Sequence, residues 1–128
     1  MKPLAGVVLL SVLILGCGRA GPTASPVKTI PLATQPPVDT VTPEVCMAAL
    51  LEGTLALDPG TGLGVAQEGR VTPVRWPNGW MALDTVPVTL ADADGTVIAH
   101  VGDHVQVGGG LGVADTWEAC PYDIKVVP

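Results

Sequence analysis

Apolar and polar residues alternate with a period of two along much of the chain beyond residue 50, and this pattern predicts β-strands. The first segment covers residues 52–57 and is closed by a cluster of turn-forming residues at 58–62. Segments 63–67 and 70–76 follow, separated by Glu68-Gly69. Two strands joined by such a dipeptide are typical of a tight hairpin.

The same period continues in the C-terminal half. Strands are predicted at 86–91, 97–101 and 104–107, with Asp94-Gly95 as a strong hairpin signal between the first two. A Gly-Asp turn precedes residue 104, so these three segments predict a meander. Residues 124–127 supply a last strand.

About seven short strands in a chain of this size cannot fill two extended sheets. We therefore predict an all-β fold: a small closed or partly open barrel, OB-like, of five to seven short antiparallel strands. A compact β-sandwich is the alternative. Thr42-Pro43-Glu44 has the residues of a helix start, which predicts one short helix reaching Ala49.

The first residues have the pattern of a secretory signal peptide. Lys2 precedes a predominantly apolar run of 12 residues from Leu4 to Leu15. This run is shorter than the roughly 20 residues that a membrane-spanning helix needs. We therefore expect residues 1–16 to be a signal peptide.

The run ends in Leu13-Ile14-Leu15-Gly16-Cys17, which resembles the lipobox of bacterial lipoproteins. The resemblance implies cleavage before Cys17 and acyl chains, such as palmitate, on that residue. Two or more chains would hold the protein on the extracytoplasmic side of the cell membrane or the outer membrane. An ordinary signal peptide, with no role for Cys17, is the alternative.

Residues 17–43 are predicted to form a tether, and residues 44–128 a single β domain. Six prolines interrupt the tether among small and polar residues, and neither apolar period is present there. Cys46 and Cys120 are the only cysteines of the predicted domain. Because they lie near its two ends and outside the reducing cytosol, we expect a disulfide between them. Two free thiols, forming a reactive or metal site, are the alternative.

Charge and composition exclude several functions. The chain has 12 acidic and 6 basic residues, and the predicted domain holds only Arg70, Arg75 and Lys125 among the basic ones. It is therefore not expected to bind nucleic acid. The predicted domain also lacks serine, which excludes a serine nucleophile. We predict a protein that is not an enzyme and needs no cofactor.

Two groups of residues are candidates for binding. Trp76 and Trp80 bracket Pro77-Asn78-Gly79, and aromatic side chains on a loop can stack against sugars or peptides. The alternative is that they fill the core. His100, Asp103 and His104 could converge across a turn to bind Zn²⁺ or Cu²⁺, which would suit a metal-binding protein or a small metal-dependent enzyme.

The segments 75–80, 94–105 and 108–110 are similar to parts of small secreted or lipid-anchored bacterial proteins of unassigned function. This resemblance implies a shared small β domain and no catalytic residue. We therefore expect a lipid-anchored binding or interaction module of the cell envelope. Its partners would be the membrane, through Cys17, and an envelope protein or glycan.

Overall fold

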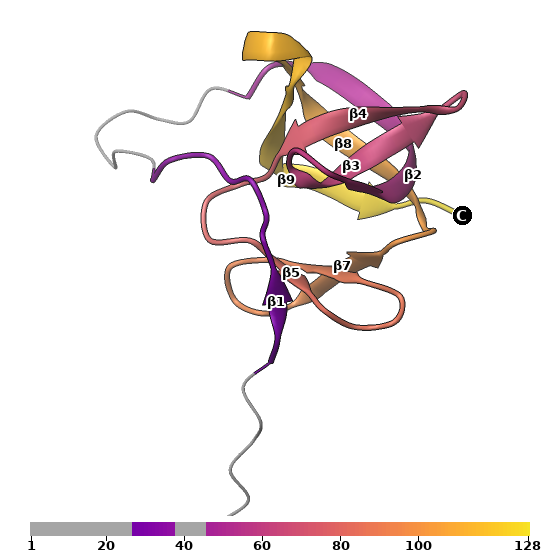
Figure 1. The fold of residues 1–128 in the computed structure, drawn as a ribbon. Helices are drawn as coiled ribbons and strands as arrows, with labels where there is room; N and C mark the ends of the chain where they lie inside the picture. Colours follow the sequence, from indigo (N-terminus) through magenta and orange to yellow (C-terminus); the bar gives the residue numbers. More distant parts are fainter. Residues whose placement is uncertain (1–26, 38–45) are drawn as a thin grey trace, which may run out of the picture.

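The computed structural model describes residues 27–37 and 46–128 (Figure 1). The predicted signal peptide, Cys17 and the predicted domain boundary at residue 44 lie outside these residues. Apart from one short 3-10 turn, η1, the regular secondary structure of the described part consists of strands. The elements are β1 Thr29–Ile30, β2 Ala49–Asp58, β3 Gly62–Gln67, β4 Arg70–Arg75, β5 Met81–Leu83, β6 Thr89–Ala91, β7 Val97–His100, β8 His104–Leu111, η1 Val113–Asp115 and β9 Trp117–Val126.

Five of the strands close into a barrel in the order β2-β3-β4-β9-β8. Numbered along the chain within the barrel, this order is 1-2-3-5-4, the arrangement of an OB-type Greek-key barrel. The predicted small barrel is thus confirmed. The expectation of antiparallel strands throughout is wrong in one place, because β4 and β9 pair in parallel. Parallel neighbours need a long connection, and residues 76–116 supply it.

Buried and exposed residues alternate along β2, so one face of this strand points into the barrel. Leu51, Gly53 and Leu55 are buried, whereas Glu52 and Thr54 are exposed, as expected for a strand with one face toward the core. The predicted hairpin between β3 and β4 is confirmed, with four residue pairs from Gly64↔Pro73 to Gln67↔Arg70.

The other strands form a second antiparallel sheet in the order β1-β5-β6-β7, below the barrel in Figure 1. The predicted meander is therefore wrong, since β7 belongs to this sheet and β8 to the barrel. Both edges of β8 are already occupied, by β2 and by β9. The Gly102-Asp103 turn carries the chain between the sheets and is held by hydrogen bonds to the backbone of Leu55, each 2.9 Å.

The prediction of a helix before β2 is also wrong for its described residues, 46–49. Ala48 makes an isolated bridge to Gly109, and Ala49 already pairs with the same residue as the first member of β2. Pairing with β8 supplies the backbone partners that a helix would otherwise provide. The start of that predicted helix lies outside the described residues. In the described ranges, no helix has the length and apolar character required for a membrane crossing.

One continuous apolar core joins the two sheets. Trp76, Leu55 and Leu63 are its largest fully buried side chains on the barrel side, and Leu90 contributes from the small sheet. The predicted disulfide is confirmed: Cys46 and Cys120 are bonded, with their Cα atoms 5.6 Å apart. It fixes the segment before β2 to β9.

Residues 27–37, which we call the strap, lie within the segment predicted as a tether but pack against the domain. β1 pairs with β5 in the small sheet, whereas Ala33 accepts a hydrogen bond from the backbone N–H of Trp76 and donates one to Thr61 of the barrel. Ile30 and Leu32 pack against the core. The strap therefore contributes apolar surface and backbone pairs to the folded part of the protein.

Candidate functional site

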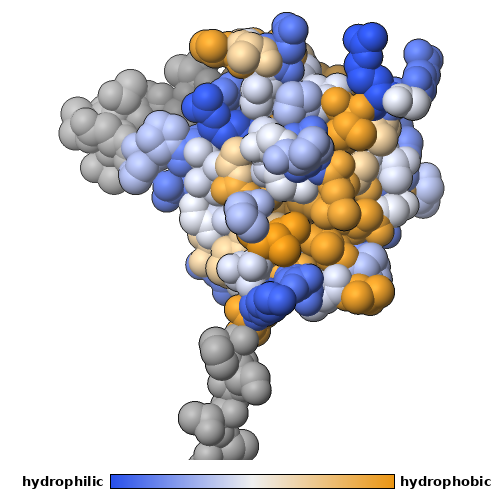
Figure 2. Space-filling model, in the orientation of Figure 1, coloured by the Kyte–Doolittle hydropathy of each residue, from blue (hydrophilic) through white to orange (hydrophobic). Residues whose placement is uncertain are grey.

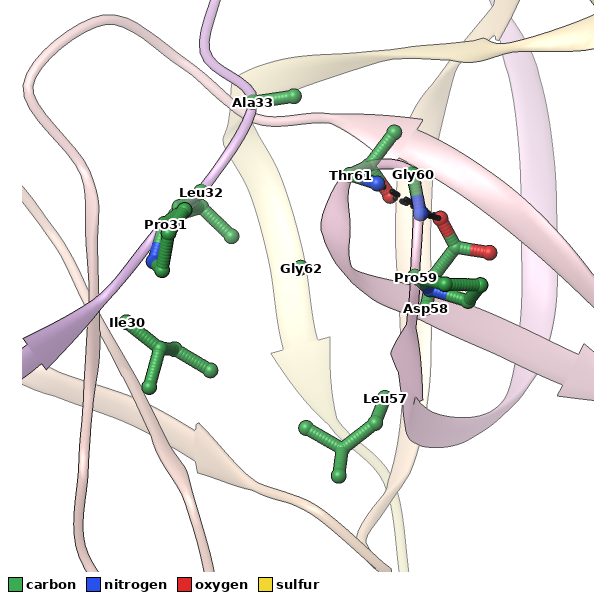
Figure 3. Close-up of a pocket in the computed structure, with 10 residues that line it drawn as sticks. All are labelled: Ile30, Pro31, Leu32, Ala33, Leu57, Asp58, Pro59, Gly60, Thr61 and Gly62. Atoms are coloured by element: carbon green, nitrogen blue, oxygen red, sulfur yellow. Dashed lines mark hydrogen bonds between the residues drawn. The ribbon is translucent and has the colours of Figure 1, made fainter.

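A groove of about 680 Å³ lies between the strap and the turn that joins β2 to β3. We call it the strap groove. In Figure 3, the side chains of Ile30 and Leu57 point toward one another across it, and Leu32 points into it from the strap. Leu57 is 56% exposed although it is a large apolar residue. Figure 2 shows apolar side chains gathered across the middle of this face of the molecule.

Local sequence determines both walls of the strap groove. Asp58 Oδ2 accepts hydrogen bonds from the N–H groups of Gly60 and Thr61, at 3.0 and 2.7 Å, and this fixes the turn. Gly62 follows with φ of +88°. A Cβ atom there would stand 2.2 Å from the carbonyl oxygen of Pro31. Glycine is therefore required for the strap to lie this close to the barrel.

The polar atoms around the strap groove are largely satisfied within the protein. The single O–H of Thr61 lies within donating distance of two acceptors, Asp58 Oδ2 at 2.9 Å and the carbonyl of Leu63 at 3.0 Å. The backbone N–H of Ala33 donates to the carbonyl of Thr61. Apart from Asp58, no lining residue carries a charge. The groove therefore offers an aliphatic surface with few polar atoms left to bind a ligand.

A second hollow, of about 510 Å³, lies beside the loop that follows β4, and we call it the aromatic groove. Its most exposed large side chain is Tyr122, at 87%. Trp80, Asn78, Asp92 and Asp94 also line it. It therefore combines an aromatic face with hydrogen-bonding groups.

Hydrogen bonds hold the walls of the aromatic groove in place. Asn78 Nδ2 donates to the carbonyl of Gln35, at 3.2 Å. Gln35 Nε2 in turn donates to the carbonyls of Arg75 and Ala119, at 3.2 and 2.7 Å. Asp92 Oδ1 accepts from backbone N–H groups of its own turn, at 2.9 Å. Because Gln35 belongs to the strap, the strap forms part of the support of this groove as well.

The two tryptophans predicted to contact a ligand are mainly core residues. Trp76 is 0% exposed, and its Nε1 donates to the carbonyl of Leu63, at 3.0 Å. Trp80 is 8% exposed and stacks on Trp76 with ring centroids 6.3 Å apart. Trp76 is therefore inaccessible to a ligand and Trp80 is almost fully buried, which agrees with the alternative that the two side chains fill the core. Tyr122 was missed, because a lone Tyr in a polar segment carries no sequence signal.

The predicted metal ligands do not converge. His100 Nδ1 lies 3.7 Å from Asp103 Oδ2, whereas His104 Nε2 bonds Glu52 Oε1 at 2.9 Å. Asp103 Oδ2 also accepts the backbone N–H of His100, at 2.8 Å, and thereby closes the turn. Among the described residues, no group of three or more His, Cys, Asp or Glu side chains is arranged to hold a metal. The two imidazoles thus lie beside different carboxylates, His100 near Asp103 and His104 hydrogen-bonded to Glu52.

Glu52 lies on the outer face of β2. Hydrogen bonds from His104 and from Gln106, the latter at 2.9 Å, lower the pKa of this carboxyl below its ordinary value. The cause is donation of hydrogen bonds to the charged form. The group is half-exposed, so these contacts indicate a surface polar cluster and not an acid poised for proton transfer.

A scan against protein-family models, a search of curated proteins and a search of solved structures each found no match to this chain. The barrel topology does not identify a ligand, since one fold serves many functions.

Proposed function

We propose that this protein is a lipid-anchored, non-enzymatic module of the cell envelope that binds a saccharide in the aromatic groove. The observation that carries the proposal is the exposed ring of Tyr122 in a hollow lined by Asn78, Asp92 and Asp94. Tyrosine is enriched at binding surfaces because its ring offers a large contact area at a low cost in side-chain entropy.

Side-chain chemistry favours a sugar over other ligands. The axial C–H groups of a pyranose ring present an apolar face to an aromatic ring, while its hydroxyls donate hydrogen bonds to carboxylates. Asp94 and Asp92 supply such acceptors beside Tyr122. A pyranose ring, with an apolar face and hydroxyls around its edge, therefore matches an aromatic ring flanked by carboxylates.

Charge narrows the class of saccharide further. No basic residue lines the aromatic groove, and two carboxylates do. Binding a phosphate or carboxylate group there would place like charges together, at an unfavourable Coulomb energy. The ligand is consequently a neutral or amino-substituted glycan, and nucleic acid and anionic polymers are disfavoured.

A titration tests the binding site. We expect the N-acetylglucosamine tetramer, as a neutral probe, to bind the wild-type protein in isothermal titration calorimetry. Tyr122→Ala should weaken it at least tenfold, or about 1.4 kcal/mol, because the stacking face is lost. Tyr122→Phe should keep the affinity within about threefold, which is about 0.6 kcal/mol.

Leu111→Ala is the matched control, because Leu111 is 57% exposed and does not line the groove. Its affinity should equal that of the wild type. Equal loss in Tyr122→Ala and Leu111→Ala, or preferential binding of a proline-rich peptide, would contradict the saccharide site.

The lipid anchor has its own test. In a bacterial host supplied with an alkyne analogue of palmitate, we expect the wild-type chain to be labelled and to sediment with membranes. Cys17→Ala should lose the label and appear in the soluble fraction, since no thiol remains for acylation at that position. Label that persists in Cys17→Ala would contradict the lipobox interpretation.

A further inference from the structure

We propose that Cys46 is a site of thiol–disulfide exchange, and that exchange there with a dithiol reductant loosens the backbone at Tyr122 and weakens ligand binding in the aromatic groove. The exchange itself does not depend on the proposed function, whereas its effect on binding rests on the saccharide site proposed above. Two observations carry the inference: the unequal exposure of the two cysteines, and the position of Cys120 directly before two residues that line the aromatic groove.

The two halves of the disulfide differ in exposure. Cys46 is exposed, whereas Cys120 is only 7% exposed. Both residues line a small hollow of about 120 Å³. A thiolate must reach one of the two sulfur atoms, so access decides which of them is attacked. We therefore expect attack on the sulfur of Cys46.

The two thiols of the reductant balance the exchange. The first, as a thiolate, attacks Cys46 Sγ and forms a mixed disulfide, and the bond to Cys120 breaks. The Cys120 thiolate takes up a proton from water. The second thiol of the reductant, once deprotonated, attacks the reductant's own sulfur in the mixed disulfide, and Cys46 leaves as a thiolate that is then protonated. The protein thus gains two electrons and two protons, and the reductant is oxidised to its disulfide.

Cys120 begins the stretch of β9 that carries Tyr122. Pairing between β8 and β9 stops at Ala119 and resumes at Ile124. Residues 120–123 lie within this interruption, so regular ladder pairing with β8 does not fix them. The disulfide is anchored two positions before Tyr122. Breaking it therefore loosens the backbone that presents the tyrosine ring.

Gln35 connects the disulfide with the aromatic groove. This residue lines both the hollow beside the disulfide and the aromatic groove itself. Its Nε2 donates a hydrogen bond, of 2.7 Å, to the carbonyl of Ala119, the residue directly before Cys120. Movement of this part of β9 after reduction would disturb that hydrogen bond as well. The buried core, which includes Trp76 and Trp117, lies outside residues 120–123, so we expect a local effect.

Backbone NMR tests the local effect. The full chain carrying Cys17→Ala keeps Cys46 and Cys120 as its only cysteines. Tyr122 is the only tyrosine and there are three tryptophans, so ¹⁵N-labelling of these two residue types gives four assignable backbone amides. The tyrosine amide reports on the groove, and the tryptophan amides are the internal control for the fold.

Reduction with dithiothreitol should change only the tyrosine signal. We expect the order parameter of the Tyr122 amide to fall from about 0.85 to below about 0.6, while those of Trp76 and Trp117 stay near 0.85. A Tyr122 amide that stays rigid in the reduced chain would overturn the proposal. Loss of order at the tryptophans would overturn it too, because the disulfide would then be a cross-link that the whole fold requires.

Glutathione identifies the sulfur that is attacked, since a monothiol leaves the mixed disulfide in place. After brief exposure and quenching with acid, trypsin separates the two cysteines by cutting after Arg70 and Arg75. We expect the glutathione adduct on the Cys46 peptide at least about tenfold more often than on the Cys120 peptide. Equal amounts on the two peptides, or an excess on Cys120, would overturn the assignment.

A titration with the N-acetylglucosamine tetramer tests control of the groove. We expect the reduced chain to bind at least about tenfold more weakly than the oxidised chain. The Cys46→Ser/Cys120→Ser variant is the matched control: it should bind like the reduced chain and should not respond to dithiothreitol. Equal affinity of the oxidised and reduced chains would overturn the proposal. Absence of binding by the oxidised chain would instead contradict the saccharide site, because the NMR and peptide measurements use no saccharide.

Discussion

Replacing Trp76 with alanine is expected to lower the free energy of unfolding by about 3–5 kcal/mol. The side chain is wholly buried and stacks on Trp80. Its removal leaves a cavity in the core shared by the two sheets and deprives the carbonyl of Leu63 of the indole N–H donor. Urea unfolding followed by circular dichroism measures the loss, with the slope of the transition as a check on two-state behaviour.

Two further variants separate packing from hydrogen bonding. Trp76→Phe keeps much of the ring volume but not the donor, and should cost about 1–3 kcal/mol. Tyr122→Ala removes an aromatic residue that is 87% exposed, and should change stability by no more than about 0.5 kcal/mol. A similar cost for Trp76→Ala and Tyr122→Ala would show that Trp76 is not the core residue described above.

Removing the disulfide should have an effect of comparable size. The bond between Cys46 and Cys120 closes a loop with a sequence separation of 74. For a loop of that length, the chain-entropy model gives a stabilisation of about 4 kcal/mol through restriction of the unfolded chain. We therefore expect the double variant Cys46→Ser/Cys120→Ser to unfold at least about 15 °C below the wild type in a thermal scan.

The single variants provide the control for this expectation. Cys46→Ser and Cys120→Ser each open the same loop, so each should lose nearly as much stability as the double variant. Additive losses would indicate local packing of the two side chains as the main cause. A double variant within 1 kcal/mol of the wild type would mean that the cross-link hardly restricts the unfolded chain.

Local patterns along the chain were sufficient for several elements. The alternation in β2 and the Glu68-Gly69 turn between β3 and β4 predicted those strands, because side-chain period and turn chemistry act over neighbouring residues. Glu68 and Gly69 both adopt positive φ, 47° and 76°, as a tight hairpin of this type requires. The disulfide was predictable because Cys46 and Cys120 were the only candidates in the predicted domain.

The candidate sites were less accessible from the sequence. Trp76 and Trp80 stood out as loop aromatics, yet burial depends on which elements pack above the loop, and the strap does so through Ala33 and Gln35. Tyr122 had no signal of its own. The His100 and His104 pair illustrates the same limit: their spacing suggested one site, but the two imidazoles lie beside separate carboxylates.

By itself, the amino-acid sequence determined the β character of this protein, most of its barrel hairpins and its cross-link, since these depend on local periodicity and on a small number of cysteines. Only the tertiary structure decided that β7 and β8 belong to different sheets, that the strap joins both sheets, and that two grooves form beside it. These features depend on contacts between residues far apart in the chain, such as Ala33 with Trp76 and with Thr61. Alternation along a strand determines which of its faces is apolar. Which element packs against that face depends on the packing of the whole domain.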